Sequence, residues 1–153
     1  MYDIIIIGAG PAGISAALYA KRANTNVLLL YHGQTSLEKA ERIDNYYGFP
    51  GGITGKELYE NGIKQAKDLG IELKEIEVIQ IENLEDSFNV KTEKESFEAK
   101  SIILSTGNKK LESDIPGIKE FEGKGVSYCA ICDAFFYKNK NVAVIGNRKV
   151  CYK

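Results

Sequence analysis

The residues whose types and spacing best suit chemistry lie in residues 128–136, YCAICDAFF. Two residues separate Cys129 from Cys132, and Asp133 follows directly. Thiols at this spacing exchange readily with disulfides, because ring closure between two neighbouring sulfurs is fast. Asp133 could donate or accept the proton that this exchange moves, and it could also cap a short helix that begins in DAFFYK. Both roles of Asp133 are compatible with a reversible dithiol.

Two other uses of the cysteine pair fit the sequence less well. A structural zinc ion needs four ligands, and the only further thiol and imidazole are Cys151 and His32, at a spacing unlike that of zinc knuckles or ribbons. A purely structural disulfide would close too small a loop to restrain the unfolded chain. We therefore expect a redox-active pair and no metal.

A second motif with a chemical meaning is GAGPAG at residues 8–13, a G-x-G-x-x-G pattern that follows an apolar run. Gly8 permits a tight turn, Gly10 lets the backbone approach a pyrophosphate, and Gly13 lets the next helix lie close to the strand. The free N–H groups at the helix N-terminus then face the phosphate charge. The motif therefore favours a dinucleotide site over a structural turn without a ligand.

The acid that usually binds a ribose hydroxyl after the second strand is missing from its expected place. That strand ends at Tyr31-His32-Gly33, and the next acid is Glu38. We therefore expect other groups, such as the backbone around Tyr31, to recognise the ribose. His32 is interpreted as a loop residue near the adenosine rather than as a catalytic base or metal ligand.

The elements around the glycine motif predict an α/β fold. Residues 4–7 and 27–30 are continuous apolar runs typical of parallel strands buried on both faces. The Ala-rich residues 11–23 between them predict a helix, with Pro11 in its first turn. Together these segments form a right-handed βαβ unit.

The middle of the chain predicts a second helix and more strands. After a long connection at residues 31–53, Thr54 and Glu57 form a capping box for a helix that ends before Gly70. Residues 71–104 hold strand-like segments, and the first two of them alternate in part between apolar and polar residues, as in a half-exposed antiparallel piece. The last segment returns to the buried parallel sheet.

The end of the chain predicts the start of another domain. A linker rich in Gly and Pro precedes the cysteine pair, and residues 142–145 predict a strand that enters Gly146. This NVAVIGN stretch resembles the opening YDIIIIGAG, which suggests a second glycine turn of the same kind.

Composition excludes several function classes. A net charge of −1 over 153 residues provides no basic face for nucleic acid. The N-terminus lacks a basic region and its apolar run is broken by glycine and proline, so we expect neither a signal peptide nor a membrane span. Three cysteines without an export signal favour a reducing cytoplasm.

Five separated segments stand in a recognisable order: IIGAGPAGISAALYAKR, IDNYYGFPGGITGKEL, IILSTG, IPG and GVSYCAICDAFFYKNKNVAVIG. From residue 1 to about 147, the chain resembles the N-terminal half of low-molecular-weight thioredoxin reductases. The resemblance implies a Rossmann-like FAD-binding domain over residues 1–112, with a parallel sheet and a small antiparallel β-meander. Residues 113–153 are then the linker, the C-x-x-C motif and the truncated start of a pyridine-nucleotide-type domain.

The resemblance also implies site roles. Such an enzyme passes electrons through FAD to the cysteine pair and on to thioredoxin. Cys132 would face the flavin, Cys129 would attack the thioredoxin disulfide, and Asp133 would be the acid/base group. The cofactor contacts follow by motif: Gly8, Gly10, Pro11, Ala12 and Gly13 at the pyrophosphate, Asn45 near the flavin ring, and Thr106 and Gly107 closing over the cofactor.

The electron donor stays open between NADPH and ferredoxin. The family's second glycine turn reads GNRK at residues 146–149, and Arg148 stands where close approach of a nicotinamide dinucleotide requires glycine. The segments SLEKAERIDNYYGF and CAICDAFFY are more similar to relatives that take electrons from ferredoxin.

Two functions are therefore kept. The first is a flavin-dependent disulfide oxidoreductase of thioredoxin reductase type, present as an N-terminal fragment that is inactive alone, because the family's C-terminal return segment is missing. The alternative is a non-catalytic FAD-binding fragment or scaffold. The last six residues, RKVCYK, match nothing in the family, and Cys151 receives no role. The full-length enzyme is expected to be a cytoplasmic homodimer.

Overall fold

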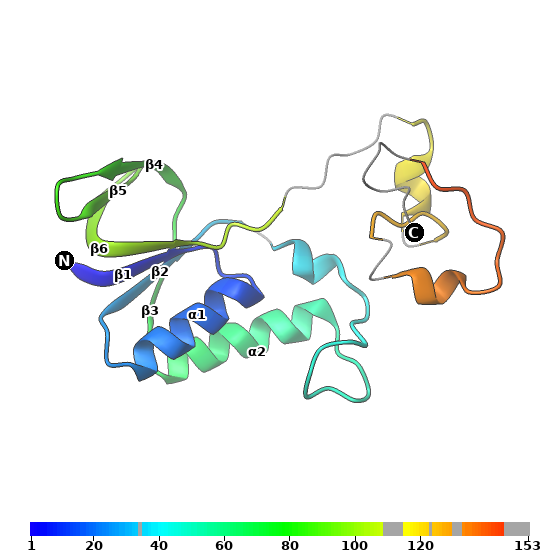
Figure 1. The fold of residues 1–153 in the computed structure, drawn as a ribbon, viewed down its shortest axis with the longest axis horizontal. Helices are drawn as coiled ribbons and strands as arrows, with labels where there is room; N and C mark the ends of the chain where they lie inside the picture. The colour runs from blue at the N-terminus through cyan, green and yellow to red at the C-terminus, as the bar shows by residue number, and fades with distance from the viewer. Residues whose placement is uncertain (34, 109–114, 123, 130–132, 146–153) are drawn as a thin grey trace. The chain divides into compact units, whose positions relative to one another are not determined.

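The computed structural model describes residues 1–33, 35–108, 115–122, 124–129 and 133–145 (Figure 1). The chain divides into two compact units, Met1–Lys109 and Lys110–Lys153. Four residues named above, Cys132, Gly146, Arg148 and Cys151, lie outside the described residues.

The first unit begins with the strand, helix and strand that the sequence predicts. β1 (Tyr2–Ile7) and β2 (Val27–Tyr31) pair in parallel, with Ile7 opposite Leu30, and α1 (Pro11–Arg22) connects them. The central residues of both strands are buried, as expected for strands covered on both faces. The predicted βαβ unit is confirmed.

Four further strands complete a mixed six-stranded sheet: β3 (Glu72–Glu75), β4 (Val78–Asn83), β5 (Phe88–Thr92) and β6 (Ser96–Leu104). Their order in the sheet is β3-β2-β1-β6-β5-β4. β6 pairs antiparallel with β5 up to Ala99 and parallel with β1 from Ala99 onwards. The expected α/β class, with a parallel core and an antiparallel meander, is confirmed.

The position of β3 differs from the expectation. The partial alternation of residues 71–82 predicted an antiparallel piece, but β3 pairs in parallel with β2, with Tyr31 opposite Glu75. The reason is the connection: α2 (Gly55–Asp68) carries the chain back along the sheet, and a strand that follows such a crossover runs parallel. Gly70, at φ 68°, makes the turn between α2 and β3.

A reciprocal capping box starts α2, as the sequence predicts. The Thr54 hydroxyl accepts from the Glu57 amide at 3.1 Å, and the Glu57 carboxylate accepts from the Thr54 amide at 3.2 Å and from its hydroxyl at 2.8 Å. The bond from the Thr54 hydroxyl, and then that from its amide, lowers the pKa of the Glu57 carboxyl. The ionised form of the Glu57 carboxylate therefore stabilises the start of α2.

Replacing Thr54 with alanine is expected to lower the free energy of unfolding by about 1 kcal/mol, because two capping bonds are lost. Thr54→Ser keeps the hydroxyl and is the matched control. Since the folded-state pKa of Glu57 is lowered, its stabilisation is present above the unfolded-state pKa and disappears as the pH falls through the folded-state value. Urea unfolding at neutral and acidic pH checks both effects. Equal stability of the alanine and serine variants would contradict this account.

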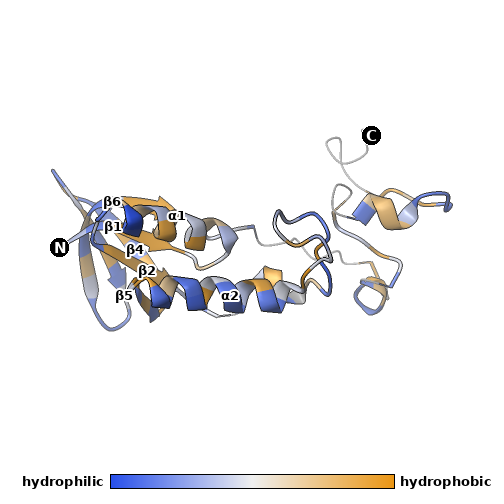
Figure 2. Ribbon diagram, turned by 90° about the horizontal axis from the view of Figure 1, so that it is seen from below, coloured by the Kyte–Doolittle hydropathy of each residue, from blue (hydrophilic) through white to orange (hydrophobic). Residues whose placement is uncertain are grey.

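Two apolar layers cover the parallel part of the sheet. On one face, α1 and α2 lie side by side and bury Ile6, Leu29, Ala17 and Ala66 (Figure 1). On the other face, residues of β1 and β2 pack against Val90, Phe97 and Ala99 of the meander. Figure 2 shows hydrophobic residues concentrated in the strands, and alternating hydrophilic and hydrophobic residues along α2. The first unit therefore has a core on each side of its sheet.

The second unit has two described 3₁₀ helices, η2 (Ile118–Phe121) and η3 (Ala134–Tyr137). The strand predicted at residues 142–145 is wrong for this structure, because these residues have no strand conformation. Val142, Val144 and Ile145 are all more than half exposed. An apolar run becomes a strand only when neighbouring strands take up its hydrogen bonds and cover its faces. Among the helices described in the chain, none is long and apolar enough to cross a membrane.

Candidate dinucleotide site and dithiol segment

The carboxyl ends of three neighbouring parallel strands form one edge of the first unit. Ile7 of β1 lies opposite both Leu30 of β2 and Leu104 of β6. The Gly8 amide continues this pairing by donating to the Leu30 carbonyl at 2.8 Å, and the Ser105 amide donates to the Ile7 carbonyl at 2.8 Å. The glycine turn is therefore held between the ends of β2 and β6, which is where open α/β sheets bind ligands.

The three motif glycines meet different surroundings. Gly8 has φ 110°, and a Cβ there would lie 2.3 Å from the Ser105 carbonyl oxygen. A Cβ on Gly13 would lie 1.8 Å from the Gly8 carbonyl oxygen. A Cβ on Gly10 would meet no protein atom within 4 Å. Packing therefore requires glycine at residues 8 and 13, whereas Gly10 borders open space that a ligand could approach.

The N-terminus of α1 is suited to an anion. Its N-cap is Gly10, which supplies no side-chain capping bond, and its first turn carries no acid. The first amide groups of a helix lack helical partners and carry partial positive charge. The open space at Gly10 therefore borders an arrangement of amide groups that suits a phosphate.

Ser105 belongs to this site and was not predicted from the sequence. Its hydroxyl lies 2.9 Å from the Gly8 carbonyl oxygen and 3.0 Å from that of Ile7. The same oxygen stands 2.5 Å from where a Gly13 Cβ would be. The only sequence signal was its place in IILSTG, directly after the strand beside β1. Ser105 therefore holds the turn from the β6 side of β1, across from β2.

Replacing Ser105 with alanine is expected to lower the free energy of unfolding by about 1 kcal/mol, because the Gly8 carbonyl loses its hydroxyl donor. Ser101→Ala, at an exposed position of β6, is the matched control and should change stability little. Urea unfolding followed by circular dichroism compares the two. If Ser105→Ala and Ser101→Ala unfolded at the same urea concentration, the Ser105 hydroxyl would not stabilise the turn.

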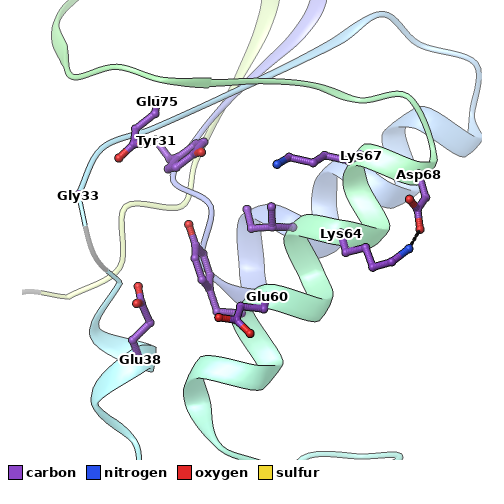
Figure 3. Close-up of a pocket in the computed structure, with 10 residues that line it drawn as sticks. Tyr31, Gly33, Glu38, Glu60, Lys64, Lys67, Asp68 and Glu75 are labelled. Carbon is purple, nitrogen blue, oxygen red and sulfur yellow. Dashed lines mark hydrogen bonds and ion pairs between the residues drawn. The ribbon is translucent and has the colours of Figure 1, made fainter.

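A cavity of about 590 Å³ lies beside the end of β2 (Figure 3). Tyr31 and Gly33 line it, together with Glu38 of η1 (Ser36–Lys39) and Glu75 of β3. Burial, and then the charge of Glu75, raises the pKa of the Tyr31 hydroxyl, which keeps it a neutral donor. The remaining lining residues come from α2: Tyr59, Glu60, Ile63, Lys64, Lys67 and Asp68.

Glu38 brings an acid to the place where the sequence lacked one. It follows β2 too late in the sequence to match the usual ribose-binding acid, yet the short helix η1 folds it back to the cavity beside Tyr31 (Figure 3). One carboxylate oxygen accepts from the Thr35 amide at 3.0 Å, which orients the side chain. The cavity therefore offers both a carboxylate and a phenol to a ligand with hydroxyl groups.

A smaller cavity of about 170 Å³ adjoins the glycine turn. Gly10 and Pro11 line it on one side, Tyr46 and Phe49 on another, and Tyr59 lines both this cavity and the larger one. Burial is the main cause of a raised pKa for the Tyr59 hydroxyl. The cavity at the glycine turn and the cavity at the end of β2 therefore share the Tyr59 side chain in their walls.

The other predicted cofactor residues lie at the rim of this edge. Thr106 and Gly107 are exposed and directly follow Ser105, and the Thr106 amide nitrogen would lie 3.1 Å from a Cβ on Gly8. Asn45 is exposed beside Tyr46, which lines the smaller cavity. His32 is exposed as well, with Nε2 4.0 Å from a Glu77 carboxylate oxygen. It does not line either of the two cavities described here.

The second unit contains the described part of the cysteine motif. Cys129 is half-buried and disulfide-bonded, and its partner lies outside the described residues. Asp133 occupies the N-cap position of η3 without a side-chain capping bond. Its carboxylate instead accepts a hydrogen bond from the Ser127 hydroxyl. The structure therefore separates the two roles considered for Asp133, because its side chain does not cap the helix.

The chain is similar to thioredoxin reductases over almost its whole length. Residues 2–147 match the family described as pyridine nucleotide-disulphide oxidoreductase. The chain is 44% identical to the thioredoxin reductase of Treponema pallidum over 148 residues, covering 95% of this chain and 48% of the relative. It is 42% identical to the thioredoxin reductase of Aquifex aeolicus over 150 residues, which cover 96% of this chain and 46% of that relative.

Solved structures show the same similarity in three dimensions. The thioredoxin reductase of Streptococcus pyogenes superimposes with a TM-score of 0.82 at 40% identity, over 89% of this chain and 45% of that one. The atypical thioredoxin reductase TRi of Desulfovibrio vulgaris Hildenborough superimposes with a TM-score of 0.67 at 41% identity, over 90% of this chain and 46% of that one. The chain spans about half the length of these relatives. It belongs to the pyridine nucleotide-disulphide oxidoreductase family and corresponds to the N-terminal portion of its thioredoxin reductases.

Proposed function

We propose that the chain binds FAD at the glycine turn and carries the dithiol of a thioredoxin reductase-type disulfide oxidoreductase. The observation that carries this proposal is the contrast within the turn, where packing closes Gly8 and Gly13 to a side chain and leaves open space at Gly10. A structural turn has no need of open space beside a helix N-terminus, whereas a pyrophosphate fills it and accepts its N–H groups.

The proposed cofactor contacts follow the two cavities that share Tyr59. The backbone of Gly8, Gly10, Pro11, Ala12 and Gly13 holds the pyrophosphate. Tyr31 and Glu38 bind the ribose hydroxyls, with Tyr31 able to donate and Glu38 able to accept. Asn45, Thr106 and Gly107 border the flavin. Once reduced by an electron donor, the bound flavin would supply the two electrons that open the disulfide containing Cys129.

For the dithiol, we propose the roles that the family resemblance implies. Cys132 exchanges electrons with the flavin, Cys129 attacks the disulfide of a thioredoxin-like protein, and Asp133 gives or takes the proton. The described part of this segment supports the last role, because the Asp133 side chain is turned away from capping η3. NADPH and reduced ferredoxin are the candidate donors for the full-length enzyme, which we propose to be a homodimer in the reducing cytoplasm.

The cofactor half of the proposal is tested by equilibrium binding to the purified chain. FAD, FMN and ADP are titrated separately, and ADP is then added to the FAD complex. We expect FAD to bind more tightly than FMN, and ADP to displace FAD, because the proposed contacts hold the pyrophosphate and the adenosine ribose, which FMN lacks. Equal binding of FMN and FAD without displacement by ADP would contradict it.

Reductive titration tests the dithiol half and separates it from the alternative of a non-catalytic FAD-binding scaffold. The full-length enzyme, loaded with FAD, is titrated anaerobically with dithionite, and free thiols are counted at each point. An oxidoreductase should take up twice the electrons that its flavin alone accepts, with thiols appearing as the flavin is reduced. A scaffold should stop when the flavin is reduced. Titrating the full-length enzyme with NADPH and with reduced ferredoxin then identifies the donor.

A further inference from the structure

We propose that Ser127 is a positioning residue for the cysteine chemistry, acting by holding the Asp133 carboxylate against the backbone of Cys129. The inference rests on the proposed function, in which Asp133 is the proton-transferring group. It adds to that function a residue outside the C-x-x-C motif.

The hydrogen bonds around Ser127 form a closed ring. The Cys129 amide donates to the Ser127 hydroxyl oxygen at 3.1 Å, and this hydroxyl donates to an Asp133 carboxylate oxygen. The Asp133 amide then donates to the Cys129 carbonyl at 3.0 Å. Ser127 thus bridges the backbone of the cysteine and the side chain of the acid.

The hydroxyl proton has a clear preferred acceptor in this ring. The Cys129 carbonyl oxygen is a second acceptor for Ser127, but at 3.4 Å it is at the long limit of a hydrogen bond. A hydroxyl carries a single proton, and a bond to a charged carboxylate is stronger than a bond to a carbonyl. The proton therefore goes to Asp133.

The position of Asp133 at the end of η3 explains why such a restraint has an effect. An aspartate at a helix N-cap normally turns its carboxylate onto the first amides of the helix. Here the side chain makes no such bond and is held toward the cysteine segment by Ser127. Without the hydroxyl, the carboxylate would be able to turn to those amides and away from Cys129.

The reaction that tests this arrangement needs neither flavin nor thioredoxin. Reduced dithiothreitol attacks the disulfide that contains Cys129, forming a mixed disulfide and expelling the other sulfur as a thiolate. The second dithiothreitol thiolate displaces the remaining protein sulfur, giving cyclic oxidised dithiothreitol. Two electrons and two protons pass to the two cysteines. A carboxylate that takes the proton of the attacking thiol and then passes it to the departing thiolate accelerates this exchange.

The experiment measures the rate of this reduction by quenching with N-ethylmaleimide and mass spectrometry of the intact chain. Ser127→Ala is expected to react about tenfold more slowly than the unaltered chain, the usual effect of losing one hydrogen bond to a charged group. Ser127→Thr keeps the hydroxyl and should restore most of the rate. Ser101→Ala, at an exposed position of the first unit, should react normally.

A double variant separates positioning from a general structural effect. If Ser127 acts through Asp133, adding Ser127→Ala to Asp133→Asn should slow the reaction no further than Asp133→Asn alone. A normal rate for Ser127→Ala, equal losses in Ser127→Ala and Ser127→Thr, or additive losses in the double variant would each overturn the inference. A slow Asp133→Asn with a normal Ser127→Ala would overturn the role of Ser127 and leave the proposed role of Asp133 standing.

Discussion

Replacing Gly13 with alanine is expected to lower the free energy of unfolding by about 3 kcal/mol and to abolish FAD binding. The new Cβ would lie 1.8 Å from the Gly8 carbonyl oxygen and 2.5 Å from the Ser105 hydroxyl oxygen. The nearer atom belongs to backbone that is itself hydrogen-bonded between β2 and β6, so it cannot rotate away. The start of α1 must then move off β1, which breaks the contact on which the turn depends.

The measurement for Gly13→Ala is urea unfolding by circular dichroism, together with FAD titration. Gly51→Ala is the matched control, because a Cβ on Gly51 meets no atom within 4 Å and this residue is exposed. We expect the control to unfold at the same urea concentration as the unaltered chain. If Gly13→Ala did so too, the close approach of α1 to β1 would not be what glycine provides there.

Local features of the fold could be predicted from the sequence because their partners lie close together in it. The capping box joins Thr54 to Glu57, three residues on, and the structure contains both of its bonds. The βαβ unit follows from two apolar runs and the glycine turn between them. The roles assigned to individual cofactor and cysteine residues depend on ligands and remain predictions.

Contacts between distant residues explain what the sequence did not predict. The Ser105 hydroxyl reaches the Gly8 carbonyl only because β6 lies beside β1. Neither segment's sequence predicts that these two strands are neighbours. Glu38 reaches the end of β2 because η1 folds back, so a search for an acid at a fixed distance along the chain misses it. Ser105 and Glu38 are both found by looking at the three-dimensional arrangement, because the residues that follow neighbouring parallel strands lie at the same edge of the sheet.

The wrong prediction for residues 142–145 has a related cause. Their apolar sequence is similar to that of β1, whose residues are buried in the middle of a sheet, whereas Val142 and Ile145 are exposed. Apolar periodicity indicates that a segment is able to form a buried strand. Whether it does so is decided by the strands and helices that cover it.

Replacing Gly10 with alanine is expected to weaken binding of both FAD and ADP about a hundredfold while leaving the free energy of unfolding within about 0.5 kcal/mol of its original value. Gly10 has φ −70°, a conformation that alanine adopts without strain, and no protein atom lies within 4 Å of the added methyl group. The methyl group would instead occupy the space in which the pyrophosphate approaches the backbone.

This outcome, set beside that of Gly13→Ala, separates the binding role of the glycine turn from its packing role. A stable Gly10→Ala chain that binds ADP as tightly as the unaltered chain would show that the pyrophosphate does not lie at Gly10. Loss of ADP binding at unchanged stability would assign the open space at the N-terminus of α1 to the phosphates. FMN, which lacks the adenosine half, serves as the comparison ligand, since its weaker binding should respond little to the substitution.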